Sequence, residues 1–281
     1  MNLSHNLART ESGHHLVLLA PDAGHLPSTF RKAMVDPRQY DALLGAMQRM
    51  RGSIYLNDGA IHHSQLESDG RHVVDSDRRS WHVLSINSAG QVEGCSRYLE
   101  HPHRTPFASL IASRAAIASH PVYGAMFSDA LRAQMEFARK SGLAFAEVGG
   151  WAVQDKLRFT TEALRIALTT FALARWLGGC IGITTATVRH CSSRILRKIG
   201  GAPLDAGAMA IPSYFDPQYQ CEMELLRFDS RSPSPRFQSW INTIFNQLAE
   251  APVVWRNREA TALQPFETSE PVRYRTARAS R

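Results

Sequence analysis

Residues 145–201 decide the fold, and they read FAEVGGWAVQDKLRFTTEALRIALTTFALARWLGGCIGITTATVRHCSSRILRKIGG. Residues 145–153 are a mainly apolar run with two glycines and no proline, which predicts a mostly buried strand. Residues 181–188 are β-branched and rich in threonine, which predicts a second strand. Between them, residues 163–177 are apolar over most of a helical surface, and residues 191–199 follow as a second helix.

The longer of these helices has clear ends and one polar side. Thr160 and Thr161 precede Glu162 at the position of a helix N-cap, and the glycines at 178 and 179 end the helix. A narrow polar stripe runs along it, formed by Glu162, Arg165, Thr169 and Thr170. A helix with so little polar surface belongs against a sheet.

The loop before this helix is a candidate anion site. A helix N-terminus presents backbone N–H groups without partners, and the helix dipole favours a negative charge there. Lys156 and Arg158 add positive charge to the same loop. The alternative is an ordinary connection between a strand and a helix, with solvated basic residues.

The remaining elements flank this segment. Residues 80–86 and 91–98 alternate apolar and polar residues around Asn87-Ser88-Ala89-Gly90, which predicts a β-hairpin. Residues 52–62 are expected to be extended or loop. Further helices are predicted at residues 38–51, 107–119, 121–140 and 236–249, and further strands at 222–228 and 253–255.

Composition limits the class of protein. The apolar fraction of 44% is ordinary for a globular core. Mean hydropathy is −0.25, and no apolar run approaches the roughly 20 residues that a membrane-spanning helix needs. No cysteine or histidine spacing predicts a metal site. Four cysteines without paired spacing are expected to be reduced and buried, as in a cytoplasmic protein: Cys95, Cys180, Cys191 and Cys221.

The charge balance is basic. The chain has 32 Lys and Arg against 25 Asp and Glu, a net charge of +7, and a pI of about 9.5. Such a balance fits nucleic acid, an anionic membrane or an acidic partner protein, or a basic surface that binds nothing. The arginines are dispersed and no nucleic-acid motif is present, so we expect no nucleic-acid partner.

The chain divides into three parts by its pattern. Residues 1–35 are predicted to be an N-terminal arm, and residues 36–256 a single domain. Residues 257–281 are polar, arginine-rich and aperiodic, which predicts a disordered basic tail.

Several motifs in order carry a resemblance to known enzymes. They span roughly residues 49–229, and their order is more specific than any one of them. They are Asp69-Gly70-Arg71-His72 up to Asp75, Ser80-Trp81-His82-Val83-Leu84, Gly94-Cys95-Ser96-Arg97, Ala146-Glu147-Val148-Gly149-Gly150-Trp151-Ala152-Val153, Ala186-Thr187-Val188-Arg189-His190, Tyr214-Phe215-Asp216-Pro217-Gln218-Tyr219 and Cys221-Glu222-Met223-Glu224. With these motifs the chain resembles bacterial N-acyl amino acid synthases and, more distantly, acyl-homoserine lactone (autoinducer) synthases.

The resemblance implies the GNAT-like acyl-CoA N-acyltransferase fold, an α/β (α+β) fold with a mixed, mainly antiparallel central sheet flanked by helices. In this fold two splayed strands hold the pantetheine arm of an acyl thioester, and the loop before the long helix takes its phosphate. Lys156, Arg158, Thr160 and Thr161 would then bind the phosphopantetheine phosphate. The helices of residues 107–140 would cover the sheet and shape an acyl pocket. No permanent cofactor is implied, because acyl-phosphopantetheine is a co-substrate.

Two departures bear on the substrates. Acetyl-CoA-using members of the fold carry a glycine-containing phosphate loop, but residues 157–163 contain no glycine. This favours an acyl carrier protein as donor and partner over coenzyme A, and an acidic carrier would suit the basic charge. The autoinducer synthases carry an arginine three residues after the strand glutamate, where this chain has Gly150. Homoserine lactone synthesis is therefore the less favoured reaction.

Acyl transfer from a thioester to an amine needs a deprotonated amine and a polarised carbonyl. Glu147 is the candidate base, since apolar neighbours on its strand would raise its pKa. The thioester oxygen would be held by the backbone N–H groups of Val148, Gly149, Gly150 and Trp151. Alternatively, Glu147 pairs with an arginine such as Arg97, and the glycines mark a β-bulge without a ligand.

The acceptor site is expected around the hairpin. Arg97 can bind an acceptor carboxylate with two parallel hydrogen bonds. Trp81 and Asp75 complete the acceptor site by resemblance, although Trp81 also fits the core and Asp75 also fits a partner for Arg97. Cys95 has no histidine and acid beside it, so a buried small residue is favoured over a nucleophile.

The sequence thus predicts an N-acyltransferase that moves an acyl group from acyl carrier protein, or coenzyme A, to an amino acid or related small amine. Three alternatives stay open: an autoinducer synthase, a catalytically inactive module that only binds a carrier protein, and a basic nucleic-acid-binding protein.

Overall fold

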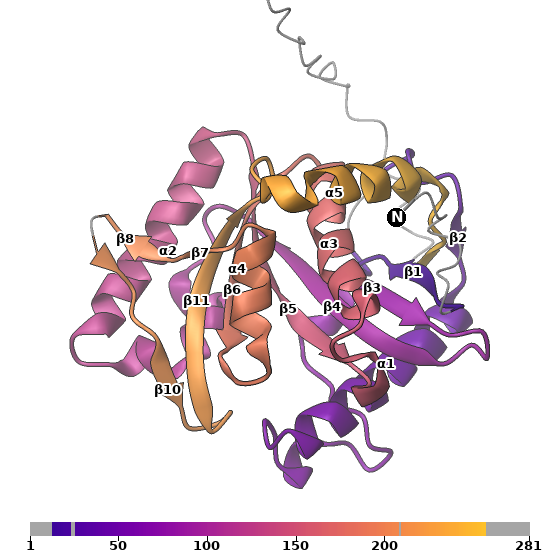
Figure 1. The fold of residues 1–281 in the computed structure, drawn as a ribbon, viewed down its shortest axis with the longest axis horizontal. Coiled ribbons are helices and arrows are strands. Elements are labelled where there is room, and N and C mark those ends of the chain that lie inside the picture. Colours follow the sequence, from indigo (N-terminus) through magenta and orange to yellow (C-terminus); the bar gives the residue numbers. More distant parts are fainter. Residues whose placement is uncertain (1–12, 24–25, 208, 257–281) are drawn as a thin grey trace, which may run out of the picture.

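A computed structural model describes residues 13–23, 26–207 and 209–256 of the chain. Their centre is a ten-stranded sheet in the order β10-β11-β6-β5-β4-β3-β1-β12-β2, with β7 paired to β11 (Figure 1). The strands are β1 (His15–Leu19), β2 (Ala33–Val35), β3 (Trp81–Ile86), β4 (Val92–His101), β5 (Ala144–Val153), β6 (Cys180–Thr187), β7 (Ala202–Pro203), β10 (Tyr214–Asp216), β11 (Cys221–Asp229) and β12 (Val253–Trp255). A short ribbon of β8 (Asp205–Ala206) and β9 (Met209–Ala210) lies apart.

The sheet is mixed and mainly antiparallel, as predicted. Only β5 with β6, β1 with β12 and β2 with β12 pair in parallel among the described residues. Within the described ranges, five α-helices flank the sheet: α1 (Pro37–Asn57), α2 (Tyr123–Lys140), α3 (Thr161–Trp176), α4 (Ser192–Ile199) and α5 (Pro235–Gln247). Helices α3, α4 and α5 lie on one face, and α1 and α2 on the other (Figure 1). None of the helices in the described ranges has the length and apolar character needed to cross a bilayer.

The strand–loop–helix–strand–helix unit is close to its prediction. Thr160 is the N-cap of α3, and its side chain accepts a hydrogen bond from the backbone N–H of Glu162. The polar stripe of α3 is buried against the sheet, where Glu162 binds Ser85 and Thr170 binds Ser96. Arg165 pairs with Glu162 one turn earlier, and Thr169 donates to the backbone carbonyl of Arg165, so these two are bonded within the helix.

Three expectations about elements were wrong. The arm of residues 1–35 contains β1, which pairs with β3 and β12 inside the sheet. Its alternate residues enter the cores on both faces, so the apolar run is a central strand. Residues 1–12 and the proposed tail, 257–281, lie outside the described residues.

Helix α1 continues to Asn57 instead of ending at Arg51. Gly52 lies inside the helix and allows the backbone of Gly70 to approach it closely. A Cβ at position 52 would lie 2.8 Å from the backbone oxygen of Gly70. Residues 107–119 are three separate 3₁₀ turns, Phe107–Ser109, Ile111–Arg114 and Ala116–Ser119, instead of one helix. Two backbone N–H groups in this segment bind the carboxylate of Glu147 instead of helical carbonyls.

Candidate functional site

The site lies where β5 and β6 separate. The two strands pair over only four residue pairs, from Ala144 with Cys180 to Glu147 with Ile183. Beyond them β5 pairs only with β4, and β6 only with β11. The facing edges of residues 148–153 and 184–187 therefore have no partner strand among the described residues, and a wedge opens between them.

A bulge in β5 marks the start of this wedge. Arg97 pairs with Gly149 and Cys95 with Ala152, so two residues of β5, Gly150 and Trp151, stand opposite one residue of β4. Gly150 has φ of +60°, and a Cβ there would lie 3.3 Å from Cβ of Arg97. Glycine is required at this position on both grounds. A bulge at these glycines was one of the two alternatives that the sequence left open.

A cavity of about 490 Å³ fills the wedge, and it is lined from both faces of the sheet. Helices α3 and α4 contribute Ala163, Ser192 and Leu196 on one face. Helix α1 and the 3₁₀ segment contribute Tyr55 and Ile111 on the other. All four residues predicted to hold the thioester oxygen line this cavity: Val148, Gly149, Gly150 and Trp151.

One end of the cavity is cationic. Arg51, on α1, donates from Nη1 and Nη2 to the two carboxylate oxygens of Asp77 at 2.9 and 2.7 Å. Both side chains are 2% exposed. Gln48 and the backbone carbonyl of His72 complete this buried network.

Arg97, on β4, lines the same end but has no carboxylate partner among the described residues. Its Nη1 donates to Ser76 Oγ at 3.0 Å, and its Nε is buried without a hydrogen-bond partner. Burial, and then the nearby positive charge of Arg51, lower the pKa of Arg97. The alternative that Arg97 pairs with Asp75 or Glu147 is not what the structure has, because Asp75 is exposed outside the cavity and Glu147 is engaged elsewhere.

Glu147 lies at the last residue pair before the strands separate, and it is 5% exposed. Its carboxylate accepts hydrogen bonds from His101 Nε2 at 2.7 Å and from the backbone N–H groups of Ile111 and Ala112 at 2.8 and 2.6 Å. Burial alone raises its pKa, but these hydrogen bonds outweigh burial and lower the pKa overall. The expected raised pKa was therefore wrong, while the catalytic role stays a prediction.

Of the four residues predicted to bind the phosphate, only Arg158 lines the cavity. Its Nη2 donates to both carboxylate oxygens of Asp58, at 2.9 and 2.8 Å, and its Nε pairs with Asp155. Lys156 is 64% exposed and pairs with Glu93. Thr160 caps α3, and Thr161 is the exposed first residue of that helix. The structure thus places Lys156, Thr160 and Thr161 outside the cavity lining.

Two of the three predicted acceptor residues lie outside the cavity. Trp81 packs in the core against Phe30, with ring centroids 5.5 Å apart. Asp75 is exposed, whereas Asp77, two residues on, reaches the site through Arg51. Cys95 is buried, and burial raises its pKa to about 11, so its thiol stays protonated and unsuited to nucleophilic attack. Cys191 is exposed, contrary to expectation.

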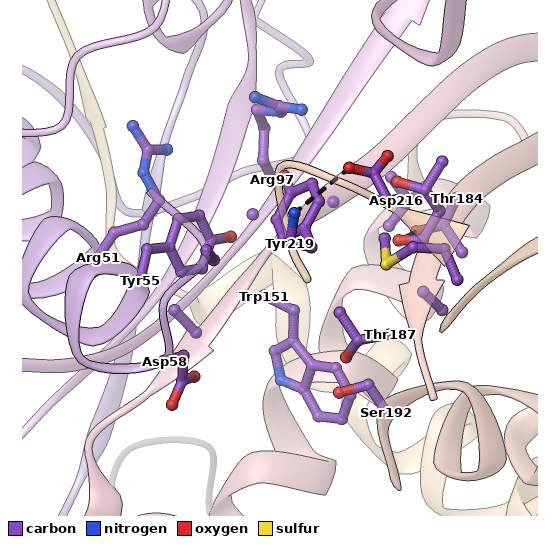
Figure 2. A pocket seen from close by; sticks show the side chains of 18 of the residues that line it. Arg51, Tyr55, Asp58, Arg97, Trp151, Thr184, Thr187, Ser192, Asp216 and Tyr219 are labelled. Carbon is purple, nitrogen blue, oxygen red and sulfur yellow. Dashed lines mark hydrogen bonds between the residues drawn. The ribbon is translucent and has the colours of Figure 1, made fainter. Parts of the chain in front are cut away.

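Sequence reasoning gave no role to several residues of the cavity. Tyr55 and Tyr219 stand beside the arginines, as Figure 2 shows. Arg189 donates from Nη2 to the backbone carbonyls of Asp58 and Tyr219. In the described ranges, no group of three or more His, Cys, Asp or Glu side chains is placed to hold a metal ion.

No family model matches the chain, and no curated protein matches its sequence. Solved structures do match. A CoA-dependent acyl-homoserine lactone synthase, BjaI, solved with MTA, is 15% identical over 87% of this chain and 94% of its own, with a TM-score of 0.52. The same synthase with SAM and isopentyl-CoA gives 0.50, at the same identity and coverage. The N-acyl amino acid synthase FeeM from uncultured soil microbes is 14% identical over 73% of this chain and 94% of its own, with a TM-score of 0.44.

At this level of identity the likeness concerns the fold. The chain therefore has the GNAT-like acyltransferase fold that its sequence predicts.

Proposed function

We propose that the protein is an N-acyltransferase that moves an acyl group from an acyl-phosphopantetheine thioester to the amine of an amino acid or related small amine. One observation carries this proposal. The cavity lies at the unpaired strand edges, and the same cavity is lined by Arg97, which has no carboxylate partner among the described residues. A thioester arm and an anionic amine substrate would then meet between the two faces.

The unpaired edges suit the donor arm. Phosphopantetheine is an extended chain with two amide groups, so it can hydrogen-bond to strand edges as a peptide does. The backbone N–H groups of Val148, Gly149, Gly150 and Trp151 would lie along the arm, near the thioester oxygen. Arg158, beside the N-terminus of α3, would approach the phosphate. Lys156, Thr160 and Thr161 would need to rearrange before touching it.

A second cavity, of about 60 Å³, lies behind the bulge and is mostly apolar. Its walls include Val148 of β5, Phe171 of α3 and Phe228 of β11. We assign the acyl chain to this space, on the α3 face of the sheet. The space is small as it stands, so it fits a short chain. The segment 107–119, expected to shape the acyl pocket, lines the cavity on the opposite face through Ile111, Ala112 and Ala115.

The chemistry is direct attack. The amine nitrogen forms a bond to the thioester carbon, the carbon–sulfur bond breaks, and the thiolate leaves and takes up a proton. Glu147 would accept the proton of the ammonium, directly or through water, because hydrogen bonds keep its carboxylate ionised. Arg97 would hold the carboxylate of the acceptor.

The donor is proposed to be acyl carrier protein or coenzyme A, in the cytoplasm. The basic charge and the glycine-free loop of residues 157–163 favour the carrier protein. Homoserine lactone synthesis is the second candidate, since the structures of BjaI share the fold. Against it, an arginine at position 150 would need positive φ and would crowd Arg97.

The test is mass spectrometry of products. Purified protein would be incubated with acyl-carrier and acyl-CoA donors of several lengths, together with a pool of amino acids or with S-adenosylmethionine. An N-acyl amino acid would support the proposal and identify the donor class. An acyl-homoserine lactone would select the second candidate. Folded protein that forms no acyl product with any donor would overturn both.

A further inference from the structure

We infer that Tyr55 and Tyr219 hold the carboxylate of the acceptor together with Arg97, and so select amines that carry a carboxylate. This inference rests on the proposed function and adds two specificity-determining residues to it. The two tyrosines come from distant parts of the chain: Tyr55 from α1, and Tyr219 from the turn between β10 and β11.

Both phenols face the cavity without a partner. Neither hydroxyl makes a hydrogen bond to another described residue, although both side chains line the cavity. Burial raises the pKa of each phenol, and the nearby charges of Arg51 and Arg97 act on both in the opposite direction. The four side chains therefore form one cluster (Figure 2). The phenols stay neutral, so each offers an O–H donor.

Arg97 is the arginine of this cluster that has no carboxylate in direct contact among the described residues. Arg51 and Arg97 bring two positive charges, whereas the adjacent carboxylate, Asp77, is fully engaged by Arg51 and Gln48. Glu147 lines the cavity too, but His101 and two backbone N–H groups occupy it. A partly buried guanidinium without a directly bonded carboxylate is costly, because its desolvation is not offset by an ion pair. A ligand carboxylate only accepts hydrogen bonds, so it can form an ion pair with Arg97 and accept hydrogen bonds from both tyrosine hydroxyls.

The turn that carries Tyr219 is held in place from three directions. Asp216, 6% exposed, accepts the backbone N–H groups of Gln218 and Tyr219 at 2.9 and 3.3 Å. Arg189 donates to the carbonyl of Tyr219 at 2.7 Å. Gln220 takes the left-handed conformation, with φ of +48°. Such strain persists where surrounding contacts enforce it, and here it fixes Tyr219 at the cavity. Asp216 and Arg189 are thus positioning residues.

The experiment measures binding apart from turnover. Wild-type protein and the Tyr219→Phe and Tyr55→Phe variants would be titrated by calorimetry with individual L-amino acids and with the matching amino-acid carboxamides. A hydrogen bond to a charged group contributes enough that losing one weakens binding about 10- to 100-fold. We expect that loss for the amino acid in each variant and little change for the carboxamide, whose affinity is already low.

Tyr40→Phe is the matched control. Tyr40 lies on α1 like Tyr55, and its buried hydroxyl has no hydrogen-bond partner, but it does not line the cavity. Its removal should leave amino-acid affinity unchanged. The inference is overturned if the wild type binds no amino acid, or if the tyrosine variants bind amino acids as tightly as the control. Amino-acid binding of the expected pattern without acyl transfer from any donor would instead overturn the proposed function alone.

Discussion

Arg51 and Arg97 line one cavity, but substituting them should affect stability differently, because only Arg51 is paired with a carboxylate. Replacing Arg51 by methionine would strand the carboxylate of Asp77, which is 2% exposed. Breaking a buried ion pair in this way costs about 3–5 kcal/mol of folding free energy. We therefore expect Arg51→Met to lower the free energy of unfolding by that amount in urea titrations. An unchanged midpoint would mean that the pair contributes nothing to stability.

Arg97→Met strands no carboxylate of the described residues, where the side chain of Arg97 hydrogen-bonds only to Ser76. We expect its free energy of unfolding to stay within about 1 kcal/mol of the wild type, because one ordinary hydrogen bond is lost. The KM for the acceptor should rise about 100-fold, since a charge-assisted pair to its carboxylate is removed. Steady-state kinetics and urea unfolding of the same preparation separate the two effects. A rise in the KM for the donor alone would mean that Arg97 binds the acyl donor instead of the acceptor.

Glu147 should remain ionised to a lower pH than a free glutamate, because its hydrogen bonds lower its pKa. Turnover should therefore be insensitive to this carboxylate at neutral pH and fall only below about pH 4.5. Glu147→Gln should reduce kcat about 100-fold or more across the neutral range, as expected for loss of a base. A pH–rate profile of kcat checks both statements. Normal turnover in the variant would leave Glu147 with the role of holding residues 111 and 112.

The sequence alone points to some of the individual residues of the site. Glu147 and Arg97 are identifiable because each sits in a strand beside glycines, where a charged side chain is unusual. Arg51 also left a signal, since it continues the apolar face of Leu44 and Met47 on its helix. Tyr219 lies in one of the motifs that carry the resemblance, but its nearness to Tyr55 was not predictable, because the two residues are 164 positions apart along the chain (219 − 55). The fall in the pKa of Glu147 also depends on contacts between distant segments.

Among the elements, α3 has the clearest consequence for specificity. Its Phe171 closes the small apolar cavity against Phe228, with ring centroids 6.3 Å apart. Phe171→Leu removes ring volume with a limited loss of packing. We expect the preferred acyl chain to lengthen by about one or two carbons, since a buried methylene contributes about 0.8 kcal/mol. Competition between donors of different length, read by mass spectrometry, measures the shift.

Phe245→Leu serves as the control for that change. Phe245 packs on Trp176 of α3, away from the lining of the small cavity. It should leave chain-length preference as in the wild type. An equal shift in both variants, or no shift in Phe171→Leu, would contradict the assignment of the acyl chain to the small cavity.

Periodicity predicted most elements and failed where distant groups compete for the backbone. The hairpin, α3 and the two strands around it follow from local pattern and caps. Residues 107–119 have a helix-like composition. Two of their backbone N–H groups nevertheless donate to the carboxylate of Glu147, which is 35 residues from Ala112. Gly52 reads as a helix end, yet it serves a close approach to the backbone of Gly70. Neither contact is visible from a local window of sequence.

For the whole molecule, acid stability provides a further test. His82 is buried, and burial lowers its pKa to about 4. In the unfolded chain a histidine titrates near 6.5, so between these values the unfolded state binds a proton that the folded state does not. Stability should therefore rise with pH across this window, by about 3 kcal/mol. His72, whose pKa burial also lowers, adds to the effect in the same direction.

Urea unfolding at pH 7 and at pH 4.5 measures this difference. His82→Gln retains an amide donor for the carbonyl of Asp77 that His82 binds. Its free energy of unfolding should depend much less on pH in this range. The same steep dependence in the variant would assign the effect to other groups.

The architecture of the whole sheet is only partly readable from the chain. The central antiparallel strands follow from the hairpin and from the resemblance to acyltransferases. Strand β1 and its parallel partner β12 are the first and last strands of the described residues, and Leu18 lies beside Val253. A pairing over such a separation has no local signal, so β1 read as part of an arm.

The four residue pairs that join β5 to β6 have a consequence for how the protein unfolds. They are the only strand pairing between the two halves of the sheet among the described residues. Without ligand, the half with β6 and β11 should open at a lower free energy than the half with β3 and β4, as a separate cooperative unit. A donor arm that bonds to both edges adds its binding free energy to the seam, about 2.7 kcal/mol at 100 times its Kd. Amide hydrogen exchange should then show two separate unfolding units in the free protein and one unit in the donor complex. The bound substrate would in that case make the whole sheet unfold cooperatively.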